Sequence, residues 1–241
     1  MPQNKTLLEV KKLGKRFGGN WAIKDVDISI NQNEIIGVIG PNGAGKTTLF
    51  NMMTGFLKPT EGEVFLRNKD ITNLESHQIC KKGVSRTFQI VKPFSGLSVL
   101  DNVMVGVLNK ENNVSKARKR AKEYIDLVGL SAFIDAPASS LPLGNRKRLE
   151  VARAVATDPE VIMLDEVMGG LNDDETVEMM DIIKKLHKEG LTILLIEHNM
   201  HALMTLSERV VVLCYGEKLA EGTPKEVSSN QKVIEAYLGS D

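Results

Sequence analysis

The chain has 241 residues, of which 42% are hydrophobic and 26% charged, and its 31 lysines and arginines balance its 31 aspartates and glutamates. This composition excludes a disordered chain and a coiled coil, and the zero net charge gives no overall attraction to nucleic acid. The two cysteines, Cys80 and Cys214, are too few for a disulfide framework and favour buried thiols in a reducing, cytoplasmic compartment. Every apolar run is shorter than the ~20 residues that cross a bilayer, so we expect no membrane span in this chain.

Two kinds of strand pattern alternate with helical stretches along the chain. Polar-interrupted apolar runs joined by turn sequences predict an antiparallel sheet from residues 7–10, 23–30 and 64–66. Continuous apolar runs rich in branched residues predict buried parallel strands at 35–39, 161–164, 192–196 and 210–214. The fold class is therefore α/β, with an antiparallel sheet beside a parallel one.

The middle of the chain, 97–138, has no strong strand pattern. Helical periodicity at 99–108 and 115–130 predicts an inserted helical subdomain, and a further helix is expected from about residue 145 to 157. Several basic residues occur in these helices, and we expect most of them to face water. They are Lys116, Arg118, Lys119, Arg120, Arg146, Lys147, Arg148 and Arg153. The methionines are expected to fill the core, namely Met52, Met53, Met104, Met179 and Met180.

A glycine-rich segment directly follows the predicted strand 35–39. It satisfies the pattern GxxxxGK[ST] with Gly40, Pro41, Asn42, Gly43, Ala44, Gly45, Lys46, Thr47 and Thr48. The glycines let successive backbone N–H groups point at a polyphosphate, Lys46 supplies a charge to the β and γ oxygens, and Thr47 offers a hydroxyl to Mg²⁺. Since the motif stands between a strand and a helix pattern, we prefer a nucleotide-binding P-loop to an ordinary turn.

Two adjacent carboxylates end the predicted strand at 161–164. Asp165 is expected to hold Mg²⁺ through water, while Glu166 is placed to polarise an attacking water. His198 follows the strand 192–196 of the same sheet, so we expect it at the same edge, in contact with a γ-phosphate. Gln89 follows 84–88 and by itself is typical of a surface amide.

The order of these motifs resembles the ATP-binding subunit of an ABC transporter over almost the entire chain. The resemblance implies a P-loop NTPase fold with a RecA-like parallel-sheet core, an N-terminal antiparallel β subdomain and an inserted helical subdomain. It divides the single ABC ATPase domain, 1–241, into a core of 1–89 and 145–241 and a helical insertion of 90–144. It also implies that Phe17 stacks on adenine, that Gln89 contacts Mg²⁺ and senses membrane subunits, and that 169–172 form the D-loop. The signature segment, which faces the ATP of a partner, would be Leu141, Pro142, Leu143, Gly144 and Asn145.

A finer resemblance is to the LivG class of branched-chain amino acid transport ATPases. It rests on VSRTFQIVKPFSGLSVLDNVMVG, the LPLG signature, GLN in the D-loop and the ending EGTPKEV with VIEAYLGSD. It implies an ATPase that uses ATP and Mg²⁺ to drive import and sits peripherally on the cytoplasmic face of the membrane. The implied partners are transmembrane permeases, a second ATP-binding subunit and, indirectly, a solute-binding protein, with no nucleic acid.

The signature departs from the usual LSGGQ. Pro142 has neither a hydroxyl nor an N–H to donate to phosphate, Leu143 replaces glycine and Asn145 replaces glutamine. Asn172 likewise replaces the usual D-loop aspartate, and Val167 the usual proline. We hypothesise a heterodimer with two unequal ATP sites, in which restoring serine at 142 and glycine at 143 changes turnover at the partner's site.

Other functions fit less of the sequence. An importer of another solute or a lipopolysaccharide-export ATPase would share many of these motifs. A soluble ABC ATPase acting on nucleic acid or ribosomes would have a long coiled-coil insertion or two cassettes. A GTPase or small-molecule kinase leaves the signature unexplained, and the nearest guanine motif, at 68–71, has its aspartate misplaced.

Overall fold

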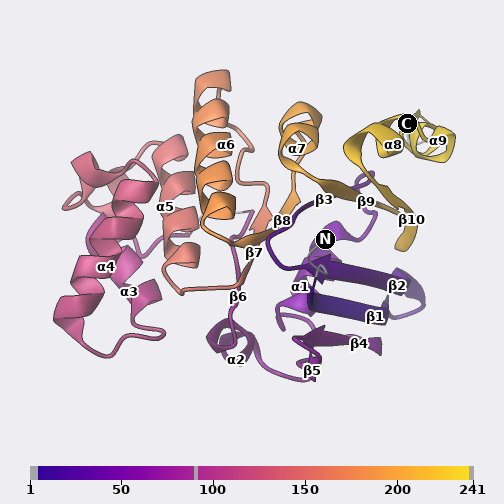
Figure 1. Cartoon of the computed structure of the whole chain (residues 1–241), viewed down its shortest axis with the longest axis horizontal. Helices are drawn as coiled ribbons and strands as arrows, with labels where there is room; N and C mark the ends of the chain where they lie inside the picture. Colours follow the sequence, from indigo (N-terminus) through magenta and orange to yellow (C-terminus); the bar gives the residue numbers. More distant parts are fainter. Residues whose placement is uncertain (1–4, 90–91, 239–241) are drawn as a thin grey trace.

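Two sheets form the framework of the computed structural model, which describes residues 5–89 and 92–238 (Figure 1). The strands are β1 (Thr6–Phe17), β2 (Asn20–Asn31), β3 (Ile35–Ile39), β4 (Glu61–Leu66), β5 (Lys69–Asp70), β6 (Val84–Arg86), β7 (Val161–Asp165), β8 (Thr192–Ile196), β9 (Arg209–Cys214) and β10 (Glu217–Gly222). The helices are α1 (Lys46–Met53), α2 (Ser76–Lys81), α3 (Val99–Val107), α4 (Val114–Leu127), α5 (Leu143–Val155), α6 (Asp173–Lys188), α7 (Met200–Leu206), α8 (Pro224–Ser228) and α9 (Gln231–Leu238).

The larger sheet has the strand order β10-β9-β3-β8-β7-β6 in the described part of the chain. Its strands β9, β3, β8, β7 and β6 run parallel, and only β10 pairs antiparallel, with β9. The four continuous apolar runs of the sequence are confirmed as β3, β7, β8 and β9. Since β3, β8 and β7 are adjacent and parallel, the residues that follow them meet at one edge of the sheet.

The smaller sheet is antiparallel, in the order β2-β1-β4-β5, which confirms the expected antiparallel subdomain. Its first two strands are longer than the sequence pattern indicates, because β1 and β2 continue through irregular register shifts between Val10 and Leu13 and again beyond Leu13. Lys12 adopts a positive φ of 45° at this irregularity. Such a bulge changes which residues face the core. The alternation of apolar and polar residues is therefore interrupted at this point, although the strand continues.

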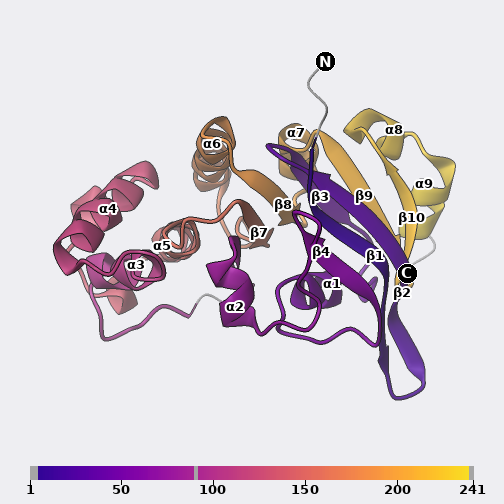
Figure 2. The ribbon, with the colours of Figure 1, turned by 60° about the horizontal axis from the view of Figure 1, so that its bottom comes forward.

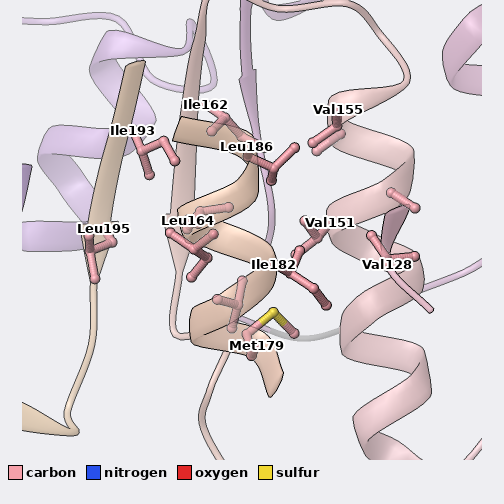
Figure 3. Packing of buried hydrophobic residues seen from close by; sticks show 14 of the residues in the cluster. Val128, Val151, Val155, Ile162, Leu164, Met179, Ile182, Leu186, Ile193 and Leu195 are labelled. Carbon is pink, nitrogen blue, oxygen red and sulfur yellow. The ribbon is translucent and has the colours of Figure 1, made fainter. Parts of the chain in front are cut away.

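The pleat of the central strands divides the core into two clusters. On β7, Ile162 and Leu164 face one cluster while Val161 and Met163 face the other, and β3, β8 and β9 alternate in the same way. The first cluster includes buried residues of α5 and α6, which lie close to one another beside the apolar residues of β7 and β8, among them Val151, Val155, Met179, Ile182 and Leu186 (Figure 3). The second contains α1 and the inner face of the antiparallel sheet. All five methionines predicted to fill the core are buried.

The helical insertion lies to one side of the sheets. Helices α3 and α4 pack on each other beyond α5, at the end of the molecule away from the antiparallel sheet (Figures 1 and 2). Helix α5 packs against these two helices and against β6 and β7. The predicted start of the insertion, residue 90, lies outside the described residues.

Three details of the sequence analysis need correction. Helix α5 begins at Leu143, two residues before the expected start, with Pro142 as its N-cap residue, because proline is well suited to the entry of a helix. Lys147 is buried rather than solvated, and Arg146, Arg148 and Arg153 are partly buried, because α5 lies between other elements. Both cysteines are free but only partly buried. Among the described residues, no helix combines the length and apolarity needed to cross a membrane.

Candidate active site

The turn between β3 and α1 requires glycine at two positions. A Cβ on Gly40 would lie 2.1 Å from the carbonyl oxygen of Leu213, and a Cβ on Gly45 would lie 2.5 Å from that of Ala22. Gly45 also has a φ of +101°, which side-chain-bearing residues avoid. Helix α1 then starts at Lys46 without a side-chain cap from the described residues, which leaves its first N–H groups available to an anion.

Lys46 folds back across this loop. Its Nζ donates hydrogen bonds to the carbonyl oxygens of Gly40 at 2.6 Å and Pro41 at 3.0 Å. Burial lowers the pKa of Lys46, while the carboxylates of Glu166 and Asp165 act in the opposite direction. The lysine predicted to contact phosphate therefore shares one electrostatic environment with the two predicted carboxylates.

The other loop residues differ in exposure. Asn42, Gly43 and Thr47 are exposed, Pro41 and Thr48 are partly buried, and Ala44 is buried with its carbonyl oxygen accepting from the Gly216 N–H at 3.2 Å. The C-terminal helix α9 also reaches the loop, where Tyr237 hydrogen-bonds to the backbone of Gly40. The loop is thus supported by residues far along the chain.

Asp165 ends β7 and is only 1% exposed. Its Oδ2 forms a buried ion pair with Arg86 Nη2 at 2.9 Å, and its N–H donates to Thr87 Oγ1 at 3.0 Å. Burial raises the pKa of Asp165, and Arg86 opposes that rise. The second oxygen, Oδ1, is buried with no hydrogen-bond partner among the described residues. A buried carboxylate oxygen without a donor suits a water-coordinated divalent cation, so this residue fits the predicted magnesium site.

Glu166 connects two of the other predicted residues. Its Oε2 accepts from Gln89 Nε2 at 2.8 Å, and its Oε1 lies 2.9 Å from His198 Nε2. The backbone of Glu166 has a φ of +52°, and its N–H donates to the carbonyl oxygen of Ile196 on β8 at 2.9 Å. This left-handed turn at the end of β7 explains why adjacent carboxylates point to different partners.

Three supporting residues were missed by the sequence analysis. Arg86 on β6 pairs with Asp165, Lys147 Nζ donates to the carbonyl oxygen of Glu166 at 2.6 Å, and Glu197 Oε1 accepts from the N–H of Met168 at 2.9 Å. Burial raises the pKa of Glu197 to about 7. For Arg86 and Glu197, the available signal was a charged residue at or next to an apolar strand pattern, as in SRTF and LLIEH, whereas no such pattern marks Lys147.

Phe17 and the signature residues lie apart from this centre. Phe17 is exposed at the turn between β1 and β2, with Lys15 Nζ 5.4 Å from its ring centroid. Leu141 is buried, Pro142 and Leu143 are exposed, and Gly144 and Asn145 lie in the first turn of α5. A Cβ on Gly144 would lie 2.4 Å from Glu175 Oε1 at the start of α6. The signature is therefore fixed against α6, and its predicted role toward a partner's ATP stays a prediction.

A groove of about 700 Å³ opens beside Gln89, between α1, α2 and β6 on one side and α3 and α5 on the other. Among its lining residues are Asn51, Phe88, Gln89, Val105 and Arg153. Phe88 and Val105 are large apolar residues left exposed here. The groove thus connects a surface with apolar side chains directly to the residue that contacts Glu166.

Comparisons with known proteins agree with this geometry. A family model described as "ABC transporter" matches residues 23–169, and one described as "Branched-chain amino acid ATP-binding cassette transporter" matches residues 217–241. Among solved structures, a nucleotide-free ATP-binding cassette from an ABC transporter is 32% identical, with a TM-score of 0.88 over 96% of this chain and 98% of that one. The ADP conformation of an ATP-binding cassette gives the same identity and TM-score over 98% and 99%.

Three curated relatives match nearly end to end. The high-affinity branched-chain amino acid transport ATP-binding protein LivG of Salmonella typhimurium is 42% identical over 97% of this chain and 98% of its own length. The corresponding protein BraF of Pseudomonas aeruginosa is 39% identical over 98% and 99%. The lipopolysaccharide export system ATP-binding protein LptB of Escherichia coli is 34% identical over 97% and 98%.

Proposed function

The chain belongs to the ABC transporter family as one of its ATPase subunits, and on that premise we propose that it powers the import of branched-chain amino acids through partner membrane permeases. The observation that carries the proposal is the position of Glu166, held between Gln89 and His198 at the sheet edge that also presents Lys46 and Asp165. The solute is assigned from the C-terminal family match and from the names of LivG and BraF, because an ATPase subunit does not itself contact the solute.

ATP binding is assigned to the loop and its flanks. Residues 40–48 would hold the phosphates through the backbone N–H groups that all of them except Pro41 possess and through the ammonium of Lys46. The exposed ring of Phe17 would stack on adenine. Thr47, Gln89 and, through water, Asp165 would hold Mg²⁺, which when bound neutralises charge on the phosphates. The unpartnered Oδ1 of Asp165 supports this assignment.

Hydrolysis is assigned to Glu166 and its two partners. The Glu166 carboxylate would accept a proton from the attacking water, while His198 and Lys46 stabilise negative charge on the transferring phosphoryl group. Gln89 Nε2 and His198 Nε2 both contact this carboxylate and would hold it in place.

The partners follow from the groove and the signature. A cytoplasmic helix of a permease would occupy the groove, because its exposed Phe88 and Val105 offer apolar contacts and its wall includes Gln89. A second ATP-binding subunit would receive residues 141–145, whose Pro142 weakens the contact with its ATP, and this favours a heterodimer. The chain would then sit at the cytoplasmic face of the membrane, with a solute-binding protein delivering the amino acid to the permeases.

The test is uptake of radiolabelled leucine, isoleucine and valine by cells that lack this chain. The wild-type gene should restore uptake, whereas a Glu166→Gln variant expressed at the same level should not. A tagged chain purified from detergent-solubilised membranes should carry two permeases and a second ATPase. Unchanged uptake of all three amino acids in the deletion strain would reject the solute assignment.

The similarity to LptB makes lipopolysaccharide export the second candidate. In that case, the deletion strain would accumulate lipopolysaccharide in the inner membrane while amino acid uptake stayed normal.

A further inference from the structure

Helix α5 turns two charged side chains into the protein interior. Lys147 and Glu150 lie three positions apart and therefore on one face of the helix, and they are 5% and 6% exposed. Charged side chains are rarely buried to this extent unless they are paired or hydrogen-bonded, because removing an ion from water is costly. The hydrogen bonds of these two side chains therefore indicate their role in the structure.

Each of the two side chains holds the backbone of a different active-site segment. Lys147 Nζ donates to the carbonyl oxygen of Glu166 at 2.6 Å, and Glu150 Oε1 accepts from the N–H of Phe88, next to Gln89, at 2.5 Å. Gln89 Nε2 in turn donates to Glu166 Oε2 at 2.8 Å. Helix α5 thus contacts the segment of Glu166 and the segment of Gln89, and the hydrogen bond between Gln89 and Glu166 joins these two segments.

The segment after β7 needs such support. Glu166 has a left-handed backbone, which side-chain-bearing residues adopt only where the surroundings impose it. Lys147 fixes the carbonyl of this residue, and Glu197 Oε1 fixes the N–H of Met168 two residues later at 2.9 Å. The direction of the Glu166 carboxylate therefore depends on α5 as well as on its own strand.

We infer that Lys147 and Glu150 are positioning residues that set the contact between Gln89 and Glu166 and thereby transmit movement of α5 to the hydrolytic centre. Helix α5 begins within the signature segment, so a partner that moves the signature also moves both anchors. The inference rests on the role proposed above for Glu166. It adds a route by which the signature helix of this chain acts on the ATP bound by the same chain.

The test is steady-state ATP hydrolysis by the full chain with Mg²⁺ present. Lys147→Met and Glu150→Leu should each lower kcat about tenfold or more, since a small misplacement of a reacting group is that costly, while KM for ATP changes less than about twofold. Lys147→Arg and Glu150→Gln keep a donor or an acceptor at each position and should recover most of the activity. Hydrogen exchange in peptides covering 163–172 should rise in Lys147→Met and stay at the parental level in Lys147→Arg.

The matched control is Arg148→Met. Arg148 also lies on α5 but pairs with Glu178 on α6, so its loss disturbs the helix without releasing Glu166. Parental kcat in Lys147→Met and Glu150→Leu would overturn the inference, as would an equal loss in Arg148→Met. If Lys147→Met and Glu150→Leu fail to fold, the decision rests on Lys147→Arg and Glu150→Gln. Parental values of KM, kcat and hydrogen exchange in these two variants support the inference. Loss of activity in either variant, when it is well folded, overturns it. A Glu166→Gln variant that hydrolyses ATP normally would instead reject the proposed role of Glu166.

Discussion

Glu166 combines an unfavourable backbone conformation with two side-chain contacts. Its φ of +52° directs the carboxylate between Gln89 and His198, whereas the preceding Asp165 stays buried against Arg86. The sequence showed only two adjacent acids after a strand. Their different surroundings support the different roles proposed for them, metal binding for Asp165 and proton acceptance for Glu166.

Glu166→Gln should abolish hydrolysis while ATP still binds. The amide keeps the size of the side chain but cannot take up a proton, so we expect kcat to fall about 100-fold or more. Calorimetric titration with ATP should give an affinity close to the parental one. Glu208→Gln, which changes a surface carboxylate near His187, is the matched control and should leave kcat unchanged.

Glu197→Gln should change the pH dependence of stability. Glu197 has a pKa of about 7 in the folded chain and an ordinary value of 4.5, so the folded state retains a proton that the unfolded state has released between these two values. The free energy of unfolding therefore falls as pH rises through this range and levels off above about pH 7.

Urea unfolding at about pH 5.5 and about pH 8 measures the effect. Between these two pH values, the free energy of unfolding of the parent should fall by about 2 kcal/mol more than that of Glu197→Gln. Each unit of pKa difference is worth about 1.4 kcal/mol. The glutamine oxygen can still accept from Met168 N–H, so the comparison isolates the charge. Parallel pH profiles of the two proteins would contradict the raised pKa.

At the scale of the elements, the sequence predicted most accurately those strands whose residues are almost all buried and therefore almost all apolar. Strands β3, β7, β8 and β9 are buried on both faces, and their apolar runs identified them correctly. The short β6 was not recognised, because Ser85 and Arg86 break its apolar pattern, although Arg86 is buried by its pairing with Asp165. The burial of Lys147 was misjudged for a related reason, because it depends on a contact with Glu166 that is distant in sequence and that no local period reveals. The start of α5 was placed two residues late because the proline at its entry was not used as a signal.

Asn172→Ala should loosen the start of α6. Asn172 Oδ1 accepts from the N–H of Glu175 at 2.8 Å, and Glu175 Oε2 accepts from the N–H of Asn172 at 3.1 Å. Alanine would remove the acceptor for the Glu175 N–H, while the backbone N–H of residue 172 could still donate to Glu175, so the free energy of unfolding should fall by about 1 kcal/mol. Asn172→Asp keeps the cap, so its free energy of unfolding, measured with denaturant, should be close to that of the parent. Equal decreases in the free energy of unfolding of both variants would argue against capping.

At the scale of the whole molecule, the groove beside Gln89 is lined by residues of the helical insertion and of the ATP-binding core. Its walls come from α1, α2 and β6 on one side and from α3 and α5 on the other. A helix docked there would touch both parts and could change their relative position. If a permease docks there as proposed, its movement would reach Glu166 through Gln89, which lines the groove and contacts that carboxylate.

Val105→Asp should prevent permease docking without harming the chain itself. Val105 is 45% exposed and lines the groove, so a carboxylate there would be buried by an incoming helix without a partner. The tagged variant should lose its permeases in membrane purification, while its melting temperature and ATP affinity remain parental. Val177→Asp on α6, 57% exposed and not among the groove's lining residues, should retain the permeases. Permeases retained by Val105→Asp would place the docking surface elsewhere.

The larger sheet lies between two hydrophobic clusters, because successive residues of its central strands face opposite sides. Leu164 and Leu195 are aligned on neighbouring strands within one cluster, whereas Leu194 points into the other. Shortening each leucine to valine should cost about 1 kcal/mol. The pair Leu164 and Leu195 should show a coupling energy above about 0.5 kcal/mol in a double-mutant cycle, and the pair Leu164 and Leu194 should be additive within about 0.3 kcal/mol. If so, the chain can accumulate changes on the helical side of the sheet independently of the side that contains α1 and the phosphate-binding loop.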